Sequence, residues 1–165
     1  MPPGLEQGIY TEGTDFELLT GCKFYFQSAS CDGRPILEVS GLSLECPPAG
    51  GNQSFGSMQA GQKLRQATPT SNKYVQVVVK CVATSNNDLF TWYTNCNNDT
   101  GKQQWTNFRE EASIFAYDQA GVEKARWDIL NCYPSKYAGP EFKSGDENMA
   151  NETIELVHEG IVRAV

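Results

Sequence analysis

The chain has 165 residues, of which 39% are hydrophobic and 20% charged, and its formal net charge is −7. This length fits a single domain, 1–165, that buries a core without needing disulfides or a metal, and the composition excludes a disordered chain. The acidic balance argues against broad contact with nucleic-acid phosphates or anionic lipid, so we expect no nucleic-acid specificity.

Residues 1–20 are rich in glycine, proline and acidic side chains and predict an extended N-terminal arm. They lack the basic and apolar regions of a signal peptide, and the sequence has no apolar run long enough to cross a bilayer. We therefore expect cytoplasmic assembly, no direct membrane anchor and six cysteines that stay reduced.

The first strands are predicted on both sides of a turn that contains Asp32-Gly33. Residues 22–27 (CKFYFQ) alternate apolar and polar side chains, as a strand does. In residues 36–45 (ILEVSGLSLE) the apolar side chains change parity at Gly41. This change predicts a bulge or a sharp bend at that glycine.

Residues 46–73 are polar and glycine-rich and predict either a long loop or an extended hairpin. A loop of this length in a compact domain is usually functional or ordered by a partner. The segment 74–83 (YVQVVVKCVA) that follows has the clearest strand pattern in the chain.

A single helix is predicted after this strand, with Asn87 or Asp88 as its cap. Its apolar residues at i, i+3, i+4 and i+7 form one stripe, made of Leu89, Trp92, Tyr93 and Cys96. Trp105 follows in a polar stretch and is either a core residue or an exposed contact residue.

The C-terminal third predicts a hairpin of 112–117 with 123–133, a loop over 135–151 and one last strand over 152–165. The total is about six or seven strands and one helix, mostly antiparallel. The fold class is therefore mainly β: a β-barrel-like sandwich of antiparallel strands with one flanking helix.

The sequence contains few residues or motifs that suggest catalysis or metal binding. His158 is the only histidine, and strand alternation places it with Ile154 and Leu156, on the face opposite Glu155 and Glu159. A metal site needs further ligands, a phosphate loop needs a lysine that the run GNQSFG lacks, and no G-x-S-x-G elbow is present. We predict no catalytic residue, no metal site and no cofactor.

Four segments, in this order, resemble phage-type tail tube proteins: ILEVSGLSLE (36–45), DLFTWY (88–93), the hairpin region 112–140, and NETIELVHEGI (151–161). The similarity spans about residues 22–162 and is greater to the phage and injection-system branch than to the haemolysin-coregulated branch. The positions that carry the resemblance are Glu38, Val39, Gly41, Leu42, Leu89, Trp92, Trp127, Pro134, Lys136, Gly139, Pro140, Ile154, Leu156, His158, Glu159 and Gly160.

This resemblance implies a structural subunit without catalysis, in which His158 has a structural role. Subunits of the family form hexameric rings that stack into a hollow tube, with a sheath around it and baseplate, spike and terminator proteins at its ends. The tube is a conduit for cargo, belongs to a phage tail or injection particle, and is ejected on contraction. The arm 1–20 and the segment 46–73 are then candidates for ring-to-ring contact.

Two other classes of function stay open at this level. The first is a soluble, ring-forming module that binds the cargo or effector of a secretion system. The second is an enzyme that depends on a metal or on a cysteine–histidine pair, which would require His158 to meet a partner in space.

Overall fold

The computed structural model describes residues 19, 23–49, 68–102, 104–145 and 147–164. The predicted arm 1–20, except Leu19, and the middle of the segment 46–73 lie outside the described residues. The elements are β1 (Phe24–Ser28), β2 (Ile36–Ser40), β3 (Leu44–Glu45), β4 (Pro48–Ala49), β5 (Thr68–Pro69), β6 (Lys73–Tyr74), β7 (Val77–Val82), α1 (Asp88–Cys96), β8 (Glu110–Tyr117), β9 (Glu123–Ala138), β10 (Asn151–Val157) and β11 (Gly160–Arg163).

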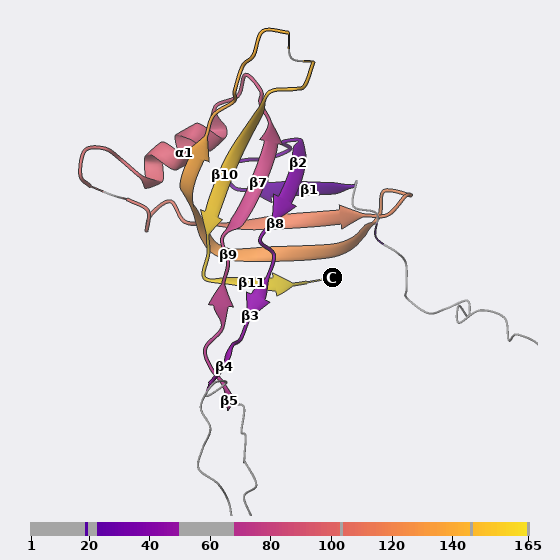
Figure 1. Cartoon of the computed structure of the whole chain (residues 1–165), viewed down its shortest axis with the longest axis vertical. Coiled ribbons are helices and arrows are strands. Elements are labelled where there is room, and N and C mark those ends of the chain that lie inside the picture. Colours follow the sequence, from indigo (N-terminus) through magenta and orange to yellow (C-terminus); the bar gives the residue numbers. More distant parts are fainter. Residues whose placement is uncertain (1–18, 20–22, 50–67, 103, 146, 165) are drawn as a thin grey trace, which may run out of the picture.

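The strands form two layers that share β9. Their antiparallel order is β1-β8-β9-β10-β7-β2, and β11 also pairs with β9. The first half of β9 pairs with β8 and β11, and its second half pairs with β10. Strands β8 and β11 run across the direction of β10 and β7 in Figure 1, as in orthogonally packed sandwiches. The predicted fold class, mainly β with one helix on the flank, is confirmed.

The bend of β9 explains two errors of the sequence prediction. Asn131 has φ +48 at this corner, and its Nδ2 donates to Glu159 Oε2 at 2.8 Å. The chain after β10 crosses between the layers at the same corner, so the expected single last strand breaks at His158 into β10 and β11. Residues 135–138, expected in a loop, instead extend β9 and pair with β10.

The core lies between the two layers and under α1. The helix contributes Leu89, Trp92 and Cys96, all fully or almost fully buried, while Tyr93 lies at the edge of the predicted stripe. Trp92 Nε1 donates to the carbonyl oxygen of Phe108 at 3.0 Å. Asn87 occupies the N-cap position but makes no side-chain cap hydrogen bond.

A buried ion pair joins distant parts of the chain. Arg34 Nη2 lies 2.9 Å from Glu152 Oε2, and both side chains are buried. The Nε and Nη1 atoms of Arg34 are buried without a hydrogen-bond partner among the described residues. Sequence reasoning missed this pair because the two residues are 118 positions apart.

Two features project from opposite ends of the longest axis of the molecule (Figure 1). At one end, β3 pairs with β6 and β4 with β5, which makes a narrow antiparallel stem that leads to residues 50–67. We call the described part of this feature, residues 44–49 and 68–74, the hairpin arm. At the other end, residues 139–150 connect β9 to β10.

Strand β2 deviates from simple alternation at Leu37, not at Gly41. Its register with β7 shifts between Ile36 and Glu38, so Leu37 is an extra residue in the ladder and its side chain is 47% exposed. Sequence alternation had placed Leu37 on the same face as Val39, which is half-buried. Gly41 directly follows the last residue of the strand and has φ +87, a backbone conformation that glycine adopts most readily.

Gly41→Ala is expected to lower the free energy of unfolding by about 3 kcal/mol, from positive φ together with overpacking. A Cβ at Gly41 would lie 2.1 Å from the backbone oxygen of Gln76. The matched control is Gly121→Ala, because Gly121 has φ +83 but an added Cβ would meet no described atom within 4 Å. The control is expected to cost about 1 kcal/mol. Equal losses in urea denaturation would show that the close approach of Gln76 is unimportant.

Candidate functional site

The positions that carry the family resemblance are distributed over the whole domain. Seven are buried, namely Leu89, Trp92, Pro134, Ile154, Leu156, His158 and Gly160. Five are half-buried, namely Val39, Gly41, Leu42, Trp127 and Pro140, and four are exposed, namely Glu38, Lys136, Gly139 and Glu159. They do not converge on one reactive centre.

Four of these positions do meet, at an apolar recess of about 340 Å³ on the side of the core between β2 and β8. The residues are Glu38, Val39, Leu42 and Trp127, and Ile114 of β8 lies with them. The two motifs at 36–45 and 112–140 are thus parts of one packing unit. Apart from Glu38, these side chains are apolar, which fits contact rather than catalysis.

His158 is held away from both neighbouring carboxylates. Its Nε2 lies 2.8 Å from the carbonyl oxygen of Val75, and its Nδ1 is buried without a hydrogen-bond partner among the described residues. Glu155 pairs with Lys136, and Glu159 pairs with Arg109. The histidine therefore joins the β10–β11 break to the base of the hairpin arm.

The described residues hold no cluster of three or more histidine, cysteine or acidic side chains that suits a metal ion. Within the same residues, no helix is long and apolar enough to cross a membrane. The five cysteines that the structure describes are free thiols, and four of them are buried: Cys31, Cys81, Cys96 and Cys132.

Burial raises the pKa of these four thiols, to about 12 for Cys31 and Cys132 and about 11 for Cys81 and Cys96. Each pKa is higher in the folded than in the unfolded chain, so their contribution to stability is complete below pH 9 and is lost as the pH rises further. We expect the free energy of unfolding to fall steadily above pH 9. Cys132→Ala should flatten this fall, and an unchanged slope would contradict the assignment.

The loop before β8 carries an exposed aromatic and charged cluster. The Arg109 guanidinium lies 5.1 Å from the centre of the Trp105 ring, and that ring lies 5.5 Å from the ring of Tyr133. Trp105 is exposed, which decides between the two alternatives for this residue in favour of the surface.

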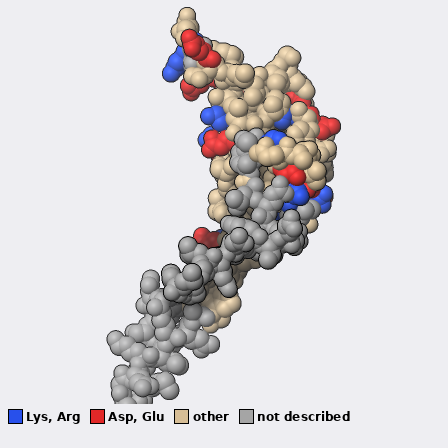
Figure 2. Space-filling model, turned by 90° about the vertical axis from the view of Figure 1, so that its right-hand side faces the viewer, with Lys and Arg blue, Asp and Glu red and all other residues tan. Residues whose placement is uncertain are grey.

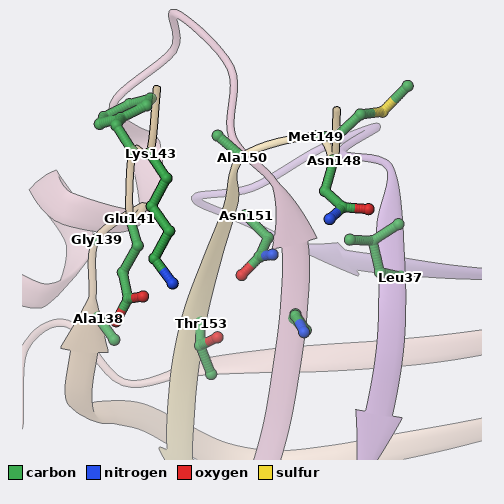
Figure 3. A pocket seen from close by; sticks show the side chains of 12 residues that line it. Leu37, Ala138, Gly139, Glu141, Lys143, Asn148, Met149, Ala150, Asn151 and Thr153 are labelled. Carbon is green, nitrogen blue, oxygen red and sulfur yellow. The ribbon is translucent and has the colours of Figure 1, made fainter. Parts of the chain in front are cut away.

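A large groove opens at the end of the molecule opposite the hairpin arm, with a volume of about 800 Å³. Figure 3 shows its sides and floor. Residues that line it include Leu37, Lys80, Glu141, Phe142, Lys143, Asn148, Met149, Asn151 and Thr153. In Figure 3, Glu141 and Lys143 lie on one side and Leu37 and Asn148 on the other. Sequence reasoning missed this groove, because it had assigned 135–151 to a loop and could not place that loop beside β2.

Charges of both signs are interspersed over the surface. On the face shown in Figure 2, basic and acidic side chains lie next to each other and do not gather by sign. Two of the ion pairs among the described residues are Lys136–Glu155 at 2.9 Å and Arg126–Asp128 at 3.2 Å. The described surface of this face has no broad basic patch of the kind that binds a phosphate backbone.

Comparison with protein families gives one match. The family model described as T4-like virus tail tube protein gp19 matches residues 20–162 of the chain. Comparison with curated proteins gives no match.

Comparison with solved structures gives similar folds at low sequence identity. A chain from the sheath-tube complex of an extracellular contractile injection system, PVC, in its extended state has a TM-score of 0.66 at 16% identity, with 88% of this chain and 90% of that chain covered. A chain from the tube-terminating cap of the anti-feeding prophage has a TM-score of 0.67 at 15% identity, with 93% of this chain and 98% of that chain covered. Hcp1 from Flavobacterium johnsoniae has a TM-score of 0.58 at 17% identity, with 86% of this chain and 94% of that chain covered. At these identities the likeness shows a shared fold.

Proposed function

The chain belongs to the T4-like virus tail tube protein gp19 family, and from this membership we propose that it forms the inner tube of a contractile, phage-tail-like injection system. As a tail tube protein it is a structural subunit. In our proposal its hexameric rings stack into a conduit for cargo, a sheath surrounds the tube, and baseplate, spike and terminator proteins complete the ends. Similar folds occur in a sheath-tube complex, a tube terminator and a baseplate, which supports these partners.

The observation that carries the proposal, beside the family, is an edge strand with one side unpaired. Among the described strands, β2 pairs only with β7. The outer side of β9 is instead partly covered by α1, because Asn97 Nδ2 donates to the carbonyl oxygen of Pro134 at 2.8 Å. Edge strands in a monomer are templates for pairing with another chain. Contact of β2 in one copy with a different surface of the next copy is heterologous, and a heterologous contact closes into a ring when the rotation fits.

Negative-stain electron microscopy with analytical sedimentation tests this function. The purified chain is expected to form rings or stacked tubes with an open channel. A compact monomer that persists at high concentration would count decisively against a tube subunit. Discrete rings that bind an effector but never stack would favour the second candidate, a soluble cargo-binding module.

The proposed role includes no catalysis, and His158→Ala tests it. The substitution removes the hydrogen bond to Val75 and leaves that carbonyl oxygen without its partner. We expect a loss of about 1–3 kcal/mol in the free energy of unfolding, with ring assembly intact. His158→Gln retains a donor and should recover part of the loss. A metal content near one per chain that disappears with His158→Ala would contradict the structural role.

A further inference from the structure

The layer β9–β10–β7–β2 has two different ends. At one end α1 packs against β9, and at the other end β2 borders the apolar recess of about 340 Å³. Figure 1 shows α1 and β2 on opposite sides of this layer. When identical subunits meet side by side in a ring, one end of each copy lies against the opposite end of the next copy. The α1 end and the β2 end are therefore expected to carry matching surfaces.

An exposed aromatic side chain lies at the α1 end. Phe90, the third residue of α1, is 49% exposed, and its ring lies edge-on to the ring of Tyr137 with 5.5 Å between the centroids. Tyr93, on the next turn of the helix, lies 6.4 Å from the same Tyr137 ring. An aromatic side chain held between a helix and a strand is already partly ordered, so its burial against a partner costs little further side-chain entropy.

The recess at the β2 end suits one aromatic side chain in size and in chemistry. Apolar side chains from both layers line it: Phe24, Val39, Ile114, Ala116 and Trp127. Its volume is at the small end of the range for ligand pockets, so it fits a single side chain better than a longer segment. Aromatic residues that fill such pockets carry much of the binding energy of protein interfaces.

The charges at the two ends are also opposite. Glu38 is the only charged residue among the described ones that line the recess, and it is exposed. At the α1 end, Lys136 of β9 is 64% exposed and pairs with Glu155. The strand registers place Glu38 and Lys136 on the same face of the layer. An ammonium group has three donors, so Lys136 can keep Glu155 and also pair with a carboxylate of the next copy.

We propose that Phe90 of each copy enters the recess of the next copy, and that Lys136 and Glu38 pair across the same contact. The recess is then completed by a side chain of the neighbouring subunit. This proposal rests on the proposed function, because it requires a ring, and it adds the side chains that close the ring. The contact joins a helix to the space between two layers, so it is distinct from backbone pairing along the edge of β2.

Two variants, each defective at one end, test the contact by analytical sedimentation and negative-stain electron microscopy. Phe90→Ser removes the aromatic ring, and Ala116→Phe fills the recess of its own copy. Each variant alone is expected to need at least about tenfold more protein than the parent to close rings. An equimolar mixture is expected to give heterodimers and no rings, because each pair offers one intact Phe90 to one open recess.

Val162→Ser is the matched control for Phe90→Ser, because Val162 is also 49% exposed but lies on β11, outside both surfaces. It is expected to form parental rings, and urea denaturation checks that every variant is folded. Parental rings from Phe90→Ser or from Ala116→Phe, or a mixture of these two without heterodimers, would overturn the proposal and leave the proposed function intact. A parent that stays monomeric would contradict the proposed function, and this proposal with it.

Glu38→Lys tests the ion pair separately and does not change the core. The control is Glu111→Lys, which makes the same change of charge at an exposed position of β8. At low salt we expect Glu38→Lys to raise the protein concentration needed for ring closure at least about tenfold, and added salt should reduce this difference. Equal effects of the two substitutions at low salt would overturn the assignment of Glu38 to the contact.

Discussion

Glu152→Gln is expected to lower the free energy of unfolding by about 3–5 kcal/mol, because removal of one partner leaves the other charge buried and uncompensated. The carboxylate of Glu152 lies 2.9 Å from Arg34 Nη2, with both side chains almost fully buried. Two further nitrogens of Arg34 already lack a partner among the described residues. The substitution keeps the shape of the side chain, so urea denaturation reports the loss of charge and not a cavity.

The matched control is Lys136→Ala, which breaks an ion pair of the same 2.9 Å length at the surface. Lys136 is 64% exposed there, and such a pair contributes at most about 1 kcal/mol. The double variant Arg34→Met with Glu152→Leu should recover most of the stability lost in Glu152→Gln. A loss in Glu152→Gln no greater than that of the control would show that Arg34 finds another partner.

Trp92→Ala is expected to cost about 3–5 kcal/mol and to separate α1 from the sheet. The indole is 1% exposed, and its Nε1 donates to the carbonyl oxygen of Phe108, which lies in the segment that enters β8. Removal of the ring opens a cavity and leaves this oxygen with only the weak Cys96 thiol donor at 3.7 Å.

Trp105→Ala is the control for the tryptophan, because its ring is exposed and contacts Arg109 and Tyr133 at the surface. We expect a loss of no more than about 1 kcal/mol. Near-ultraviolet circular dichroism reports the loss of tertiary structure during urea denaturation. Trp92→Ala should lose this signal at a lower urea concentration than Trp105→Ala. Equal midpoints for both variants would contradict the central position of Trp92.

The segment 46–73 and the groove differ in how far the sequence predicts them. The polar, glycine-rich composition of 46–73 predicted a long loop or an extended hairpin. The groove was not identified, since it combines the bulge at Leu37 with a connection that follows β9. A pattern of residues along the chain has no information about which two segments enclose a space.

The sequence by itself determined the local elements and the family. Alternation predicted the β7 strand and the β8–β9 hairpin, and four ordered motifs identified the family. The spacing of Leu89, Trp92, Tyr93 and Cys96 predicted the helix. These signals are local, because side-chain periodicity follows from backbone geometry within a few residues.

Only the tertiary structure decided how β9 bends at Asn131, why the last strand breaks at His158, and which buried carboxylate neutralises Arg34. Each of these depends on register and on the crossing of two layers, which brings together residues as far apart as Arg34 and Glu152, 118 positions. The periodicity of side chains predicts structure only within a single strand or helix. A pair such as Arg34–Glu152 forms because both groups are buried in the same part of the core.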